Sequence, residues 1–197
     1  MYLAVEGPIG VGKTTLAKAL AEALGLEPLL EVVEENPFLP LFYQDRARYA
    51  FKTQVFFLLS RYRQLLPLAQ RRLFGGVVAD YLFDKDALFA SLTLEGPEWD
   101  LYQDLYRELA LRLPPPDLTL YLRAPVPVLL ERIARRGRPF ERGMDPGYLE
   151  ALLQAYDRHF ARYPHPLLVL EAEGLDYRPG GKDLERVVGL VRERLAL

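Results

Sequence analysis

Near its start the chain reads Gly7-Pro8-Ile9-Gly10-Val11-Gly12-Lys13-Thr14, followed by Thr15. It fits the pattern G-x-x-x-x-G-K-[ST] at every fixed position, after an apolar strand-like run and at the start of a helical pattern. Glycines let backbone N–H groups converge on phosphates, and the helix N-terminus adds positive potential. We therefore predict a nucleotide-binding phosphate loop at residues 7–15.

Two side chains of this stretch carry its chemistry. Lys13 can reach the β- and γ-phosphates of ATP, and the Thr14 hydroxyl can bind Mg²⁺. The alternative is a glycine-rich turn that only joins a strand to a helix. The lysine, the threonine and both flanking elements together disfavour that alternative. We expect ATP and Mg²⁺ as cofactors.

Short apolar strands alternate with longer helical patterns along the chain, which is typical of a parallel α/β sheet. We predict strands at Tyr2–Glu6, Leu29–Val33, Val77–Asp80, Leu118–Leu122 and Leu167–Leu170. We predict helices at Lys13–Leu24, roughly Leu39–Leu73 with a kink at Pro67, Lys85–Leu94, Glu98–Leu113, Pro127–Arg136, Pro146–Tyr163 and Lys182–Leu195. The expected fold is an α/β domain over residues 1–197, with a mostly parallel five-stranded sheet and helices on both faces.

The composition limits the partners. The 197 residues carry a net charge of −2, which offers no basic surface for nucleic acid. There is no cysteine, so disulfides and thiolate metal sites are excluded, and we interpret His159 and His165 as packing or surface residues. No apolar run approaches the ~18 residues that span a bilayer. Because the first strand already begins at Tyr2, we expect a cytoplasmic protein with no leader and no membrane partner.

A phosphate loop does not by itself identify the acceptor of the phosphate. GTPases read their base with an Asn-Lys-x-Asp motif, whereas the one asparagine here, Asn36, is followed by proline. Transport-type ATPases need a Ser-Gly-Gly signature, which this sequence lacks. These exclusions favour a small kinase.

Further along, the chain resembles the deoxynucleoside kinase family, close to its bacterial deoxyadenosine and deoxyguanosine kinases. The resemblance covers essentially the whole chain and rests on Glu31 through Leu39, Phe42-Tyr43, Ala50-Phe51 with Gln54, Ser60-Arg61, Asp80 with Asp86 through Ala90, Pro116-Asp117-Leu118, and Arg132 through Glu141. It implies a P-loop kinase fold and transfer of phosphate from ATP to the 5′-hydroxyl of a deoxyribonucleoside, in nucleotide salvage. It also implies a homodimer.

The resemblance assigns two carboxylates to the reacting groups. Glu31 matches the glutamate that acts as base beside the 5′-hydroxyl, near the end of the predicted second strand. From the residues alone, Glu34 and Glu35 would be equal rivals. Asp80 follows an apolar strand, the usual place for a carboxylate that holds Mg²⁺. The family has an arginine after this acid, but this chain has Tyr81, so either another arginine takes over its task or the task is dropped.

Other residues match the family's nucleoside contacts. Gln54 and Arg61 lie two turns apart on one helix and, with Asp86, are expected to read the base. Their hydrogen-bonding groups suit deoxyadenosine or deoxyguanosine best, then deoxycytidine. Tyr43 and Glu141 match the pair that grips the 3′-hydroxyl.

The arginine-rich segment at about residues 132–145 resembles the family's lid. Its Arg132 and Arg136 are expected to fold over ATP and neutralise the transferring group. Asp176 and Tyr177 match a loop near the adenine of ATP.

Two other readings stay open. One is a nucleoside monophosphate kinase of the thymidylate-kinase type, which needs additional arginines for the acceptor phosphate. The other is a non-catalytic nucleotide-binding subunit, which would not need Lys13, Thr14 and Glu31 to be intact.

Overall fold

Strand β1 (Tyr2–Glu6) lies at the centre of a parallel sheet in the computed structural model, which describes residues 1–33, 35–71 and 75–196. The other strands within these residues are β2 (Glu27–Leu29), β3 (Val77–Ala79), β4 (Leu118–Arg123) and β5 (Leu167–Glu171). Their order is β2-β3-β1-β4-β5, and every neighbouring pair is parallel. The predicted α/β fold with a five-stranded parallel sheet is confirmed.

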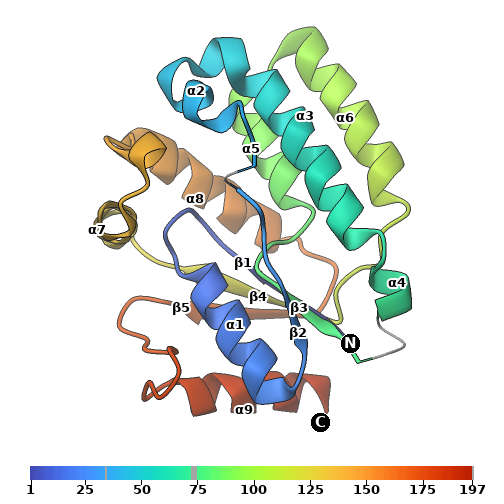
Figure 1. Ribbon diagram of the computed structural model, residues 1–197, viewed down its shortest axis with the longest axis vertical. Coiled ribbons are helices and arrows are strands. Elements are labelled where there is room, and N and C mark those ends of the chain that lie inside the picture. The colour runs from blue at the N-terminus through green and yellow to red at the C-terminus, as the bar shows by residue number, and fades with distance from the viewer. Residues whose placement is uncertain (34, 72–74, 197) are drawn as a thin grey trace.

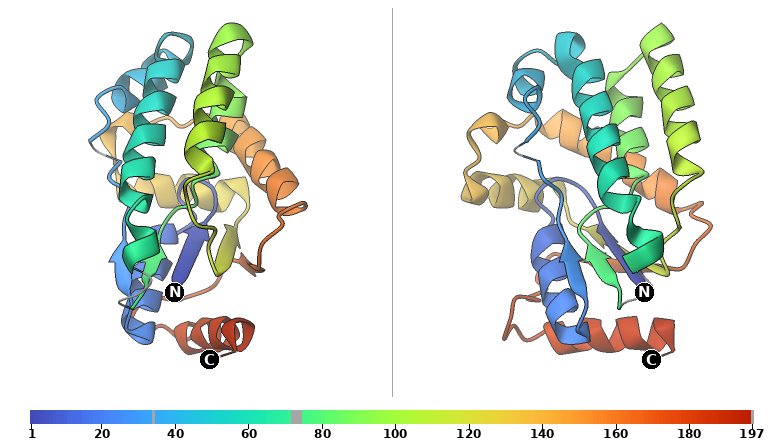
Figure 2. Two further views of the ribbon diagram at one scale, coloured as in Figure 1. Left: turned by 90° about the vertical axis from the view of Figure 1, so that its right-hand side faces the viewer. Right: turned by 45° about the vertical axis from the view of Figure 1, so that its right-hand side comes forward.

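Helices lie on both faces of this sheet (Figures 1 and 2). Helix α1 (Lys13–Leu24) contacts β1, β2 and β3 and packs beside α9 (Leu184–Leu195). Toward the other face lie α3 (Arg46–Leu65), α5 (Lys85–Thr93), α6 (Gly96–Ala110) and α8 (Pro146–Phe160). The remaining elements are α2 (Leu39–Gln44), α4 (Leu68–Arg71), α7 (Val126–Arg136) and the 3₁₀ turn η2 (Pro139–Glu141).

One buried carboxylate ties the centre of the sheet to its surroundings. Glu6, the last residue of β1, has no exposed surface. It accepts the Gly7 N–H at 2.7 Å, the Leu82 N–H at 2.8 Å and the Tyr156 hydroxyl at 3.0 Å. The start of the phosphate loop, the segment after β3 and helix α8 are therefore held at one point.

The predicted second strand was wrong in position. We expected it at Leu29–Val33, but β2 spans Glu27–Leu29. Its one partner in the described residues is β3, and the pairing ends where Leu29 meets Ala79. Beyond that point the chain leaves the sheet, because Asp80 accepts the Glu31 N–H with its side chain in place of a strand neighbour.

The predicted helix at Leu39–Leu73 was also wrong as a single element. It is divided into α2, α3 and α4. Asp45 causes the first break, since it has a non-helical backbone and its carboxylate caps α3 by accepting the Arg48 N–H. The second break falls at Leu66 and Pro67, where a kink was predicted. Leu73 lies outside the described residues, and the other predicted elements differ from the observed ones by three residues or fewer at either end.

Candidate active site

The phosphate loop leaves β1 at the carboxyl edge of the sheet and enters α1. Gly10 has φ 83° and Gly12 has φ 105°, a left-handed region that favours glycine. A Cβ atom at Gly12 would also collide with the Tyr177 hydroxyl. That hydroxyl donates to the Val11 carbonyl at 3.0 Å, so Tyr177 supports the loop from behind.

Lys13 folds back over the loop that precedes it. Its ammonium donates to the carbonyls of Gly7 at 2.7 Å and Pro8 at 3.1 Å. Burial, and after it the positive charge of Lys85, lower the pKa of Lys13 to about 8. Such a lysine carries a charge that an incoming phosphate would stabilise.

Asp80 stands between the phosphate loop and Glu31. Its Oδ2 accepts the Thr14 hydroxyl at 2.5 Å, and its Oδ1 accepts the Glu31 N–H at 2.7 Å. A hydroxyl and a carboxylate side by side are hard oxygen ligands of the kind that Mg²⁺ prefers together with phosphates and waters. The described part of the chain has no group of three or more His, Cys, Asp or Glu side chains that could hold a metal ion. A Mg²⁺ ion at Thr14 and Asp80 would therefore need phosphates and waters as further ligands.

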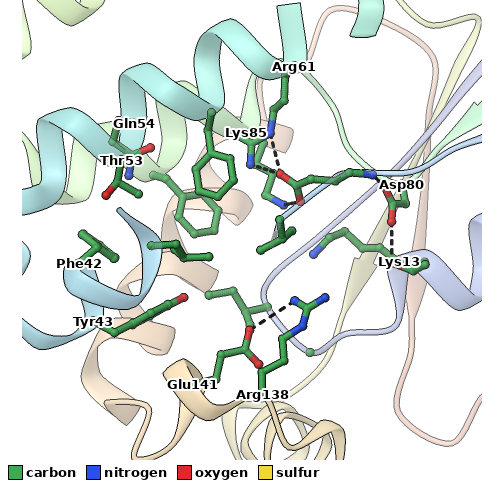
Figure 3. A pocket seen from close by; sticks show the side chains of 18 of the residues that line it. Lys13, Phe42, Tyr43, Thr53, Gln54, Arg61, Asp80, Lys85, Arg138 and Glu141 are labelled. Carbon is green, nitrogen blue, oxygen red and sulfur yellow. Dashed lines mark hydrogen bonds and ion pairs between the residues drawn. The ribbon is translucent and has the colours of Figure 1, made fainter. Parts of the chain in front are cut away.

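Glu31 lies in the loop beyond β2 and is held by two cations. Arg61 donates to its Oε1 through Nε at 2.7 Å and also through Nη2, and Lys85 donates to its Oε2 at 2.8 Å (Figure 3). Burial alone would raise the pKa of Glu31, but the charges and hydrogen bonds of Arg61 and Lys85 hold that pKa far below its usual range. Glu31 is therefore a carboxylate at any working pH. Of its rivals, Glu35 is exposed and Glu34 lies outside the described residues.

Sequence reasoning missed Lys85. Helix α5 begins at this lysine, five residues after Asp80. It therefore lies close to the position where the family has an arginine and this chain has Tyr81. Tyr81, which stands in place of that arginine, is fully buried and donates to the Gln64 side chain at 2.8 Å. The missing arginine was a signal that another cation acts here, although we expected that cation to be an arginine.

The residues predicted to read the base do not all reach the same surface. Gln54 and Arg61 line a first cavity, which also exposes Glu31, Asp80 and Lys85 (Figure 3). Asp86 is fully buried and does not line this cavity; it forms an ion pair with Arg61 Nη1 at 2.6 Å. Arg61 thus links Asp86 to Glu31. Burial raises the pKa of Asp86 to about 6, and the nearby Arg61 charge offsets part of that rise.

The predicted lid closes the opposite wall of the first cavity. Arg136 donates to both oxygens of Glu141, at 2.6 and 2.7 Å, and Arg138 lies 3.7 Å from the same carboxylate. The ring of Phe140 stacks on Tyr43 of α2, with centroids 6.1 Å apart. Tyr43 and Glu141, predicted as a pair, therefore line the cavity together.

A second cavity lies on the other side of the phosphate loop. It is lined by Thr15, Arg132, Asp176 and Tyr177, among others. Arg132 donates to the carbonyls of Val11 at 2.8 Å and Ala172 at 2.9 Å, so it braces the loop, while Asp176 binds Arg178. The two cavities share a set of wall residues, namely Gly10, Lys13, Thr14, Arg136 and Arg138. Groups bound in each would meet at Lys13 and Thr14.

Known proteins that are similar to this chain include kinases of deoxynucleosides. Residues 3–196 match the family described as deoxynucleoside kinase. The chain is 38% identical to the deoxyguanosine kinase of Bacillus subtilis (strain 168), over 98% of this chain and 96% of that protein. It is 31% identical to the deoxyadenosine/deoxycytidine kinase of the same organism, over 94% and 89%. Among solved structures, deoxyadenosine kinase from M. mycoides with bound dCTP superposes with a TM-score of 0.81 and 27% identity, over 100% of this chain and 99% of that one.

Proposed function

The chain belongs to the deoxynucleoside kinase family, and from that membership we propose how its two cavities divide the reaction. As a member it phosphorylates deoxynucleosides, with ATP as the phosphate donor. We place ATP in the second cavity and the nucleoside in the first, with the 5′-hydroxyl as acceptor. The observation that carries this assignment is the shared wall at Lys13 and Thr14, which has Glu31 and Asp80 beside it.

Glu31 orients the 5′-hydroxyl. In transfer, the 5′-oxygen bonds to the γ-phosphorus, while the bond to the bridging oxygen breaks and leaves its electron pair on ADP. The hydroxyl proton passes to the Glu31 carboxylate and then to water. A loose transition state asks little basicity of this carboxylate, which agrees with its lowered pKa. Lys13 neutralises the phosphates on the donor side.

Thr14 and Asp80 would hold Mg²⁺ together with the phosphates of ATP. The metal would neutralise charge on the phosphates and help to align them. The Asp80 carboxylate also fixes the Glu31 backbone through its second oxygen, so the metal site and the acceptor site share one side chain.

The nucleoside is recognised at both ends of the first cavity. Tyr43 and Glu141 grip the 3′-hydroxyl, and the tyrosine ring leaves little room for a 2′-hydroxyl. Gln54 and Arg61 face the base, and Asp86 acts through Arg61 by holding its guanidinium. These groups suit deoxyadenosine and deoxyguanosine, with deoxycytidine next. Relatives named deoxyguanosine kinase and deoxyadenosine/deoxycytidine kinase support these three substrates, while the order rests on the hydrogen-bonding groups.

The lid acts on the donor side. Arg136 and Arg138 line both cavities, and of these two lid arginines we assign Arg136 to the transferring phosphoryl group. Arg132 acts by bracing the phosphate loop, and Asp176 and Tyr177 bound the region of the ATP base. Closure of this lid would exclude water and suppress ATP hydrolysis.

The assembly we propose is a homodimer that works in the cytoplasm in nucleotide salvage. Leu101 and Leu105 lie one turn apart on α6 and are 52% and 37% exposed, which supports a second copy packed on this helix. None of the helices in residues 1–33, 35–71 and 75–196 is both long and apolar enough to cross a membrane.

The family match favours a nucleoside acceptor over the monophosphate of a thymidylate-kinase-type enzyme. The contacts of Asp80 with Thr14 and Glu31, and the presence of Lys13 on the shared wall of the two cavities, likewise disfavour a non-catalytic subunit. The test is a phosphorylation panel of the four deoxynucleosides and their monophosphates with ATP. If the monophosphates alone were phosphorylated, the acceptor assignment would be wrong. If none of the eight compounds were phosphorylated, the proposal that this chain is a catalyst would be wrong.

A further inference from the structure

Lys85 is a buried cation on the wall of the first cavity. Its residue is 6% exposed, and its ammonium donates to Glu31 Oε2 at 2.8 Å. The ring of Phe89, one turn along α5, lies 5.6 Å from the ammonium. The position is thus defined by an ion pair and an aromatic face, and both hold the ammonium beside the cavity.

Most of the hydrogen-bonding capacity of Lys85 is not used by the protein. An ammonium carries three N–H donors, and Glu31 is the one hydrogen-bond acceptor found for it in the described part of the chain. Buried donors are nearly always bonded to protein, water or a ligand, so the other two N–H groups are open to acceptors that enter the first cavity. Arg61 differs in this respect, because its Nε and Nη2 bind Glu31 and its Nη1 faces Asp86.

Lys85 and Lys13 face the cavity from different elements. Lys13 starts α1 and Lys85 starts α5, and both line the first cavity with Glu31 and Asp80. The two ammonium groups are close enough that the charge of Lys85 contributes to the lowered pKa of Lys13. Two neighbouring cations that repel each other, here the buried Lys85 and the half-buried Lys13, are stabilised by an anion bound between them.

We propose that Lys85 binds the phosphoryl group from the acceptor side during its transfer, opposite Lys13. The proposal rests on the proposed function, in which Glu31 orients the 5′-hydroxyl. As the 5′-oxygen bonds to the γ-phosphorus and the bond to ADP breaks, Lys85 keeps its bond to Glu31. Its other two N–H groups donate hydrogen bonds to one equatorial phosphoryl oxygen and to the attacking oxygen. A lysine on α5 thereby supplies the charge that was expected from an arginine after Asp80.

The test separates direct contact from an action through Glu31. Lys85→Met and Lys85→Arg are made in the wild type and in Glu31→Gln, with Lys18→Met as a control, because Lys18 is an exposed lysine of α1 outside both cavities. We expect Lys85→Met to lower kcat ~10²-fold, the scale for one transition-state donor, with little change in KM for ATP. Lys85→Arg should lose less, and Lys18→Met nothing. In Glu31→Gln, Lys85→Met should lower kcat by a similar further factor.

The proposal is overturned if Lys85→Met has no further effect once Glu31 is glutamine, since Lys85 would then only position Glu31. It is also overturned if wild-type kcat survives Lys85→Met. If Lys85→Met does not melt cooperatively, Lys85→Arg is compared in its place. A decrease in kcat by the same factor in the wild type and in Glu31→Gln supports direct contact. A decrease in kcat that occurs in the wild type alone contradicts it. A wild type that phosphorylates no deoxynucleoside would instead contradict the proposed function.

Discussion

The Asp80 carboxylate accepts the Glu31 backbone N–H at 2.7 Å with one oxygen and the Thr14 hydroxyl at 2.5 Å with the other. One side chain therefore sets the distance between the proposed Mg²⁺ ligand of the phosphate loop and the proposed base. Displacement of Asp80 should disturb both functions, whereas displacement of Glu31 should disturb one.

Substitutions at these two carboxylates should separate in their dependence on Mg²⁺. Glu31→Gln should lower kcat ~10²-fold or more at saturating Mg²⁺, the usual scale for a general base. Asp80→Asn should raise the Mg²⁺ concentration needed for half-maximal rate and also lower kcat, because its amide can no longer accept both bonds. Rates measured across a Mg²⁺ titration give both numbers. Glu35→Gln is the control, since Glu35 is exposed; a silent Glu31→Gln would move the base assignment elsewhere.

Lys13→Ala should abolish phosphate transfer and leave the fold intact. Within the described residues, the ammonium donates to two carbonyls of its own loop, so its removal costs little packing. The measurements are turnover with every deoxynucleoside and the melting temperature, with Lys18→Ala as the matched control. Near-wild-type turnover in Lys13→Ala would refute the role of this loop in binding ATP.

Deoxyadenosine or deoxyguanosine should have the highest kcat/KM, followed by deoxycytidine, with thymidine poor. A base that leaves a buried hydrogen-bonding group of the base site without a matching partner costs about 1–3 kcal/mol. This free energy corresponds to a ~5- to 150-fold lower kcat/KM for that nucleoside. Arg61→Met with Asp86→Ala should raise the ratio of thymidine to purine. Because Arg61 also holds Glu31, this double variant should lose activity toward every nucleoside, and the ratio is the quantity to measure. Thymidine leading the wild-type panel would contradict the base assignment.

Asp86 should make stability depend on pH near 6. Its folded pKa of about 6 lies above its ordinary value of 3.8, so the folded protein takes up a proton as the pH falls through 6. Asp86 thus stabilises the fold most below pH 4, and this contribution is lost as the pH rises through 6. From pH 7 to pH 5, the melting temperature of the wild type should gain a few degrees relative to Asp86→Asn. The groups facing Asp86 are the same in both proteins: Arg61, Glu31, Lys85, Tyr102 and Tyr106. Parallel pH curves would contradict the prediction.

The homodimer should depend on helix α6. Leu101→Glu with Leu105→Glu should convert a dimer of two 22.6 kDa chains into a monomer, because charges would replace apolar surface in the contact. Light scattering after size-exclusion chromatography gives the mass. Val169→Glu, at an exposed apolar position on β5, is the control. A dimer that survives the α6 charges must use another surface.

The sequence predicted those features that depend on local backbone and chain order. The phosphate loop needs glycines at fixed positions before a helix, so its place is written in consecutive residues. The position of β2 was wrong because a three-residue edge strand is ended by a tertiary contact, the Asp80 carboxylate on Glu31, and not by a local signal. The break at Asp45 did have a local signal, since an aspartate three residues before a helical N–H is a cap.

In the candidate site, sequence indicated which residue types meet but not which partner each one takes. Arg61 was assigned to the base, yet its guanidinium is divided between Asp86 and Glu31. Arg132 was assigned to ATP, yet it binds backbone carbonyls. The missing arginine after Asp80 indicated that another cation was needed, but only the fold shows that Lys85 reaches Glu31. Such pairings depend on side-chain reach across separate elements, which spacing along the chain does not determine.

The contacts of Glu6 bear on whether the phosphate loop can be transplanted. The loop's first N–H is held by this carboxylate, which also fixes Leu82 of the segment after β3 and Tyr156 of α8. A foreign scaffold given residues 7–14 alone would receive the glycines, the lysine and the threonine without that anchor. The eight residues are therefore not an interchangeable module. A graft that keeps their geometry has to carry Glu6 and its partners from two distant parts of the chain.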